Sequence, residues 1–136
     1  MPSAHRLLQI ALAVFGAVFL LIYPLALIWP SGWVWHSGSP HQSNYYLMIV
    51  GVYATLGVFL LKAARDPKAN ISLIWFAVWS SVVHAAIMAV QSFGSGDHLG
   101  HLFGDVPALL LVAGVLSALM LSSRLSEDTR APSRSG

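Results

Sequence analysis

Imidazole and carboxylate side chains gather in one short stretch of this 136-residue chain. His98, His101 and Asp105 follow a spacing of i, i+3 and i+7, which places them on one face of a short helix. Asp97 joins His101 and Asp105 in a second set at i, i+4 and i+8. Imidazole nitrogens and carboxylate oxygens at such spacing bind zinc, copper or iron. The alternative is that Asp105 caps a helix ahead of Pro107 and that the histidines lie at a membrane interface.

His84 differs from these residues because it lies inside a long apolar stretch. It is about nine residues from the outer end, or roughly 13 Å deep at 1.5 Å per residue. Ionisable side chains at that depth are costly and usually face the protein interior. Helical spacing puts Ser81, Met88 and Gln91 on the same stripe, with Ser80 one turn away. The stripe predicts a metal, haem or quinone site, a proton path, or interhelical hydrogen bonding worth on average about 0.6 kcal/mol.

Two site hypotheses follow from these residues. The first is a divalent metal site, with copper, zinc or iron bound near the outer surface by His84, His98, His101, Asp97 and Asp105. The second is a cofactor held by His84 and Met88, in which haem is disfavoured because no second span carries a histidine at that depth. Since the chain has no cysteine, disulfides, thiolate nucleophiles and cysteine-ligated metals are excluded.

Four apolar runs must position these residues. The composition is 57% hydrophobic and 9% charged, whereas soluble domains average roughly 25% charged. Each run is about long enough to cross a bilayer as a helix. We predict an all-α integral membrane four-helix bundle over residues 1–122, with helices at about 7–29, 45–62, 71–93 and 105–123. Residues 123–136 lack apolar periodicity and predict a disordered cytoplasmic tail.

The positive charges predict the orientation. All seven basic residues fall on one side of the four spans, at Arg6, Lys62, Arg65, Lys68, Arg124, Arg130 and Arg134. The positive-inside rule therefore places both termini in the cytoplasm, and we expect a multi-pass protein of a bacterial inner membrane. The opposite boundary carries an aromatic belt, with Trp29, Trp33, Trp35, Tyr45 and Tyr46. Because the basic pI near 9.3 follows from this topology, nucleic-acid binding is not indicated.

Small residues and one proline predict how the helices pack. Small residues recur at four-residue spacing, which lets backbones approach closely, at Ala13 with Ala17, Gly51 with Thr55, and Gly114 with Ala118. These faces meet either within one chain or between chains, and we expect a homo-oligomer or a subunit of a membrane complex. Pro24 predicts a kink near the outer end of the first helix.

The stretch from Tyr45 to Leu111 resembles a family of small bacterial integral membrane proteins known only as a domain of unknown function. The resemblance rests on Gly-Val-Tyr-Ala-Thr-Leu-Gly-Val-Phe-Leu-Leu at 51–61, Ala-Arg-Asp-Pro at 64–67, Trp-Ser-Ser at 79–81 followed by His84, and His-Leu-Phe-Gly-Asp-Val-Pro at 101–107. The four-span layout also resembles DoxX-like proteins, in architecture alone. Neither resemblance implies a reaction, so no site residue comes from it.

Three functions remain open at this stage. The first is a small membrane protein that binds a metal ion or redox cofactor through the outer His/Asp cluster. The second is a non-catalytic subunit or scaffold, packed through its small-residue faces. The third is a carrier for an uncharged or lipid-like molecule, which the polytopic topology supports and the lack of charge within the spans opposes. That lack also disfavours a proton antiporter. Whether the protein is an enzyme stays open.

Overall fold

The computed structural model describes residues 2–28, 44–94 and 103–128. These residues form the helices α1 Ala4–Ile28, α2 Asn44–Arg65, α3 Ile71–Gly94 and α5 Asp105–Asp128, with a short 3-10 helix η3 at Lys68–Asn70. The four α-helices are each long and apolar enough to cross a membrane. The prediction of an all-α protein with four such helices is therefore confirmed, and the bounds differ by a few residues.

Local capping explains where the first two helices begin and end. Ser3 precedes α1, where its Oγ accepts a hydrogen bond from the Arg6 backbone N–H at 3.3 Å and its carbonyl accepts one from the Leu7 N–H at 3.0 Å. The helix therefore starts earlier than hydropathy alone predicts. At the other boundary, α2 continues through basic residues to Arg65 and ends there, because the next residue, Asp66, precedes a proline and is disfavoured in a helix.

The last helix is longer than the sequence analysis predicts. α5 runs to Asp128, so residues 124–128 are helical where the analysis places a disordered tail from residue 123. A helix already formed by its apolar part propagates into polar residues at little cost, since each added residue gains one backbone hydrogen bond. Residues 29–43, 95–102 and 129–136 lie outside the described part of the chain.

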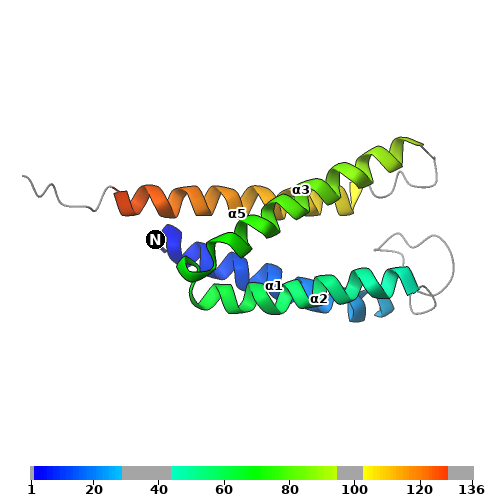
Figure 1. The fold of residues 1–136 in the computed structure, drawn as a ribbon, viewed down its shortest axis with the longest axis horizontal. Coiled ribbons are helices and arrows are strands. Elements are labelled where there is room, and N and C mark those ends of the chain that lie inside the picture. Colours follow the sequence, from blue (N-terminus) through cyan, green and yellow to red (C-terminus); the bar gives the residue numbers. More distant parts are fainter. Residues whose placement is uncertain (1, 29–43, 95–102, 129–136) are drawn as a thin grey trace, which may run out of the picture.

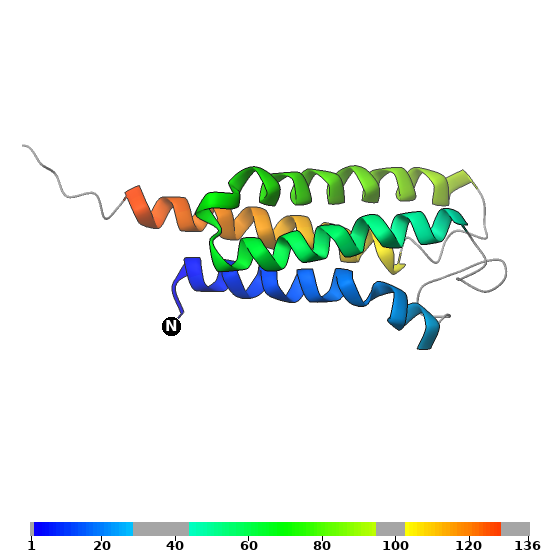
Figure 2. The same cartoon turned by 60° about the horizontal axis from the view of Figure 1, so that its bottom comes forward.

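The connection between α2 and α3 is tight and well bonded. The Asp66 side chain accepts a hydrogen bond from the Ala69 N–H at 3.2 Å, and the Asp66 carbonyl accepts one from Asn70 Nδ2 at 2.8 Å. Next to this turn, the Lys62 ammonium lies 5.3 Å from the centre of the Phe59 ring. This turn, the start of α1 and the end of α5 lie at the same end of the molecule (Figures 1 and 2).

The helices are arranged as two pairs. α1 packs along α2 and α3 packs along α5, while α2 and α3 share few contacts although they follow each other in sequence. Figure 1 shows α2 and α3 close at their connection and farther apart toward the other end. In Figure 2, α1 bends close to its C-terminal end, and the helix contains Pro24 there, as predicted.

Side-chain burial follows the same division. All four helices contribute to the main core, which contains Leu8, Leu12, Phe19, Leu60, Ala63, Ile74, Ala77, Val78, Val112, Ala113, Leu116 and Met120. Beyond it lie two smaller clusters: Ala26, Tyr46 and Val50 join α1 to α2, and Ala85, Val106 and Leu109 join α3 to α5. The bundle therefore shares one core near η3 and divides into two pairs toward its other end.

Two glycines bring α1 and α2 into backbone contact. A Cβ added to Gly16 would lie 2.9 Å from the carbonyl oxygen of Gly57, and one added to Gly57 would lie 2.7 Å from that of Gly16. By contrast, a Cβ at Gly51 or Gly114 would meet no atom within 4 Å. The small residues that bring the first pair together are thus Gly16 and Gly57, whereas Gly51 and Gly114 make no close contact inside the described chain.

We expect Gly57→Ala to destabilise the fold by about 1–3 kcal/mol, because its Cβ meets backbone rather than a flexible side chain. Gly114→Ala is the matched control, since the same methyl group enters open space and alanine favours the helix. Unfolding midpoints in mild detergent, followed by circular dichroism, measure both effects. An unchanged or higher midpoint for Gly57→Ala would contradict the proposed packing of α1 on α2.

Candidate functional site

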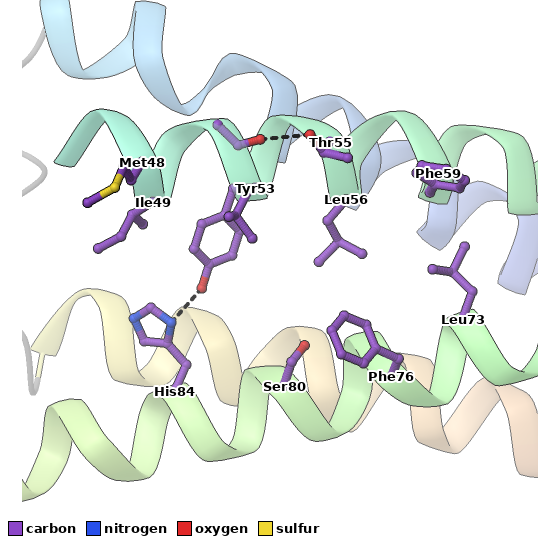
Figure 3. A pocket seen from close by; sticks show the side chains of 12 residues that line it. Met48, Ile49, Tyr53, Thr55, Leu56, Phe59, Leu73, Phe76, Ser80 and His84 are labelled. Carbon is purple, nitrogen blue, oxygen red and sulfur yellow. Dashed lines mark hydrogen bonds between the residues drawn. The ribbon is translucent and has the colours of Figure 1, made fainter. Parts of the chain in front are cut away.

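A groove lies between α2 and α3, where the two helix pairs diverge (Figure 3). Its volume is about 840 Å³, and its walls come from two helices only: Met48, Ile49, Gly51, Val52, Tyr53, Thr55, Leu56 and Phe59 on α2, and Leu73, Phe76, Ser80 and His84 on α3. None of these twelve lining residues carries a formal charge when His84 is neutral. The groove is therefore an apolar site with a few polar side chains.

A hydrogen bond between Tyr53 and His84 spans the groove. The Tyr53 hydroxyl oxygen lies 2.8 Å from His84 Nδ1, and the ring centres are 5.7 Å apart (Figure 3). Tyr53 is nine residues from the start of α2 and His84 is ten from the end of α3, so each lies about 14 Å along its helix. When the hydroxyl donates to Nδ1, the proton of the neutral imidazole is on Nε2.

The first helix pair holds Tyr53 in this position. The ring of Phe19 on α1 meets the Tyr53 ring edge to face, with centres 5.1 Å apart and planes at 73°. Tyr53 is also partly buried against the main core. Such aromatic packing restricts the ring, so the hydroxyl is aimed at α3 before any ligand arrives. Tyr53 is not among the residues predicted from the sequence, although its depth matches that of His84 on the neighbouring antiparallel helix.

Asp105 is the one carboxylate near this pair in the described part of the chain. It is the first residue of α5, where a negative charge is favoured by the helix dipole. Its charge is close enough to interact electrostatically with His84, Tyr53 and Tyr46. Of the five predicted metal ligands, His84 and Asp105 belong to the described part of the chain, and they interact electrostatically.

The other three predicted ligands, Asp97, His98 and His101, lie outside the described residues. Within ranges 2–28, 44–94 and 103–128, no group of three or more His, Cys, Asp or Glu side chains is arranged to hold a metal ion. The predicted five-residue metal site consequently stays a prediction.

The polar stripe predicted on α3 is distributed over different surfaces. Ser80 lines the groove with His84, and its hydroxyl donates to the Ala77 carbonyl at 3.2 Å. Ser81 is buried, Met88 packs against the cluster between α3 and α5, and Gln91 is exposed. This distribution arises because α3 packs against α5 on one side and borders the groove on another. A cofactor held jointly by His84 and Met88 also stays a prediction.

We expect Tyr53→Phe to change the tautomer equilibrium of His84, because Nδ1 loses the hydroxyl with which it shares a hydrogen bond. Nitrogen-15 NMR of histidine-labelled protein at a pH where the ring is neutral measures the proton on each ring nitrogen. The control is Tyr45→Phe, the same chemical change at a highly exposed residue of α2. Identical His84 signals in wild-type protein and Tyr53→Phe would mean that the hydrogen bond is absent in the membrane.

The model of a protein family of unknown function (DUF6632) matches residues 2–135. This match confirms the resemblance drawn from the sequence and extends it from the 45–111 stretch to nearly the whole chain. No match is found among curated proteins or solved structures.

Proposed function

Because the chain belongs to this family of unknown function, which brings no reaction with it, we propose a function from the groove itself. The protein binds an uncharged, lipid-soluble molecule between α2 and α3 and serves as its membrane carrier or binding protein. The observation that carries this proposal is the apolar groove of about 840 Å³ with the Tyr53–His84 pair inside it. Small-molecule sites have this volume and this combination of apolar walls with a few fixed polar groups.

The groove suits a ligand that arrives from the bilayer. Several of its wall residues are largely exposed in the isolated chain, with exposed fractions of 62% for Met48, 68% for Val52 and 61% for Phe76. In a membrane these side chains face acyl chains, so a ligand can enter sideways without crossing water. It must be uncharged, because no lining residue offers an opposite charge and ionised groups in a bilayer are expensive.

The proposed setting is a bacterial inner membrane with both termini in the cytoplasm. The supporting observation concerns the described basic residues. Arg6 lies in the first turns of α1, Lys62 and Arg65 in the last turn of α2, and Lys68 in η3, all at one end of the bundle. The positive-inside rule favours that end as the cytoplasmic one. Tyr53 and His84 then lie in the outer half of the membrane, near the outward end of α5.

Metal binding is the second candidate, and the observation that favours it is the electrostatic interaction between Asp105 and His84. A metal on His84 Nε2 would require the proton on Nδ1, which would then donate to the Tyr53 oxygen, as non-ligating nitrogens of metal-bound histidines usually do. The nitrogen-15 experiment on His84 distinguishes the two functions. Metal binding predicts a protonated Nδ1 and lipid binding a protonated Nε2.

Association with other chains also stays a prediction, as a homo-oligomer or as a subunit of a larger membrane complex. The groove gives this alternative a specific form, because a helix from another chain would compete with a small molecule for the same apolar wall. Binding measurements on groove variants therefore bear on both ideas.

We expect a periplasmic reporter fused after residue 136 to be inactive and a cytoplasmic one to be active in bacterial cells. Fusions within residues 30–44 should show the reverse pattern, because that segment holds no lysine or arginine. An active periplasmic reporter at the C-terminus would contradict the proposed orientation.

We expect Gly51→Leu to reduce ligand binding several-fold. Gly51 lines the groove and a Cβ there meets no atom within 4 Å, so the new side chain occupies ligand space without straining the fold. The probe is a long-chain alcohol bearing a photoreactive diazirine, cross-linked in lipid nanodiscs and mapped by mass spectrometry. Labels should fall on α2 and α3 in the wild-type protein.

Gly114→Leu is the matched control, because this glycine is equally open but lies on α5, outside the groove. The probe should cross-link to Gly114→Leu to the same extent as to the wild-type protein. Equal labelling of both variants, or loss of self-association in Gly51→Leu without loss of labelling, would contradict the proposed function and favour a helix as the occupant of the groove.

A further inference from the structure

We propose that His84 selects ligands whose uncharged head group presents a carbonyl oxygen, as in a quinone ring or a carboxylic ester attached to an apolar chain. This inference rests on the proposed function, since it concerns the head group of the molecule in the same groove. It assigns His84 Nε2–H as the hydrogen-bond donor to the ligand and Tyr53 as a positioning residue that acts through the imidazole.

The direction of the Tyr53–His84 hydrogen bond determines which hydrogen-bonding group faces the ligand. Among the described parts of the chain, the bond between Nδ1 and the Tyr53 hydroxyl is the one hydrogen bond that the His84 side chain makes. Donation by Tyr53 leaves the ring proton on Nε2. In Figure 3 the second ring nitrogen points away from Tyr53, toward the Met48 end of the groove. With the Tyr53 hydroxyl as the donor in this pair, the groove presents an N–H donor to a ligand.

The groove wall at that end offers no strong acceptor of its own. Met48 and Ile49 lie there in Figure 3, and neither side chain accepts hydrogen bonds strongly. A donor in apolar surroundings gains most from a partner that accepts without donating, because a hydroxyl head group brings a hydrogen that itself needs a partner. A carbonyl oxygen meets this requirement and adds no charge.

Charge near the site argues against the ionised alternatives. Asp105 interacts electrostatically with His84, so an anionic head group such as a fatty carboxylate would be repelled. A cationic head group such as an amine would be drawn to Asp105 but carries only donors, which oppose the N–H of His84. An uncharged head group that accepts a hydrogen bond is compatible with both the Asp105 carboxylate and the His84 N–H.

The test is competition against the diazirine alcohol probe in nanodiscs by three molecules of equal chain length: a decyl-substituted benzoquinone, a decyl ester and decylbenzene. We expect the quinone or the ester to displace the probe at about tenfold lower concentration than decylbenzene, the effect of satisfying one buried donor. Preference for the quinone identifies a redox lipid as the source of the carbonyl, and preference for the ester identifies an acyl lipid. Either preference supports the inference.

Substitutions at His84 make the result specific. His84→Phe keeps an aromatic ring but removes the donor, so the three competitors should become equivalent within about twofold. His84→Gln retains an amide N–H and should keep part of the preference. This variant keeps the test valid if His84→Phe fails to fold. Tyr45→Phe should leave the preference unchanged.

Two results would overturn the inference: equal displacement by all three competitors in the wild-type protein, or a preference that survives in His84→Phe. Both leave the proposed function standing as long as the probe labels α2 and α3. If the probe labels neither helix, the proposed function itself fails, and the two failures are thereby distinguished.

Discussion

The close backbone approach of Gly16 and Gly57 holds α1 against α2 and limits how the other two helices can pack. In lipid the hydrophobic effect does not hold helices together, so association relies on close packing and on polar contacts between helices. The two glycines let α1 and α2 approach so closely that a methyl group on either one would collide with the backbone of the other. Because α2 packs mainly against α1 and α3 mainly against α5, α2 and α3 make few contacts with each other. The groove follows from this division into pairs.

The same division gives the polar pair its significance. Tyr53 belongs to the first helix pair and His84 to the second, and their hydrogen bond joins the pairs beyond the shared core. Phe19 on α1 orients the Tyr53 ring, and Tyr53 in turn bonds to His84. The packing of α1 on α2 therefore influences the position of the imidazole. An individual interhelical hydrogen bond contributes modestly to membrane-protein stability. Its greater effect here is chemical, because it selects which imidazole nitrogen carries the proton that faces the groove.

The sequence predicted the parts of this structure that depend on composition. Continuous apolar runs identified four helices, and the depth of His84 in one of them singled out that residue. Helix ends were less predictable, because the Ser3 cap and the continuation of α5 through polar residues are local effects that hydropathy does not register. Gly16 and Gly57 could not be predicted from spacing. Spacing identifies a helix face made of small residues, but it does not show which residue of another helix packs against that face. The same reason applies to Tyr53, whose partner His84 lies on another helix. Of the two tyrosines predicted at the interface, Tyr45 is exposed, whereas Tyr46 is buried between α1 and α2.

A crystal structure of the protein grown from a lipidic phase would show what occupies the space between α2 and α3. We predict elongated electron density along the apolar wall, with an oxygen atom about 2.7–3.2 Å from His84 Nε2 and no metal on that nitrogen. A metal ion at about 2.0–2.1 Å from Nε2, or a helix of another chain filling the groove, would contradict it.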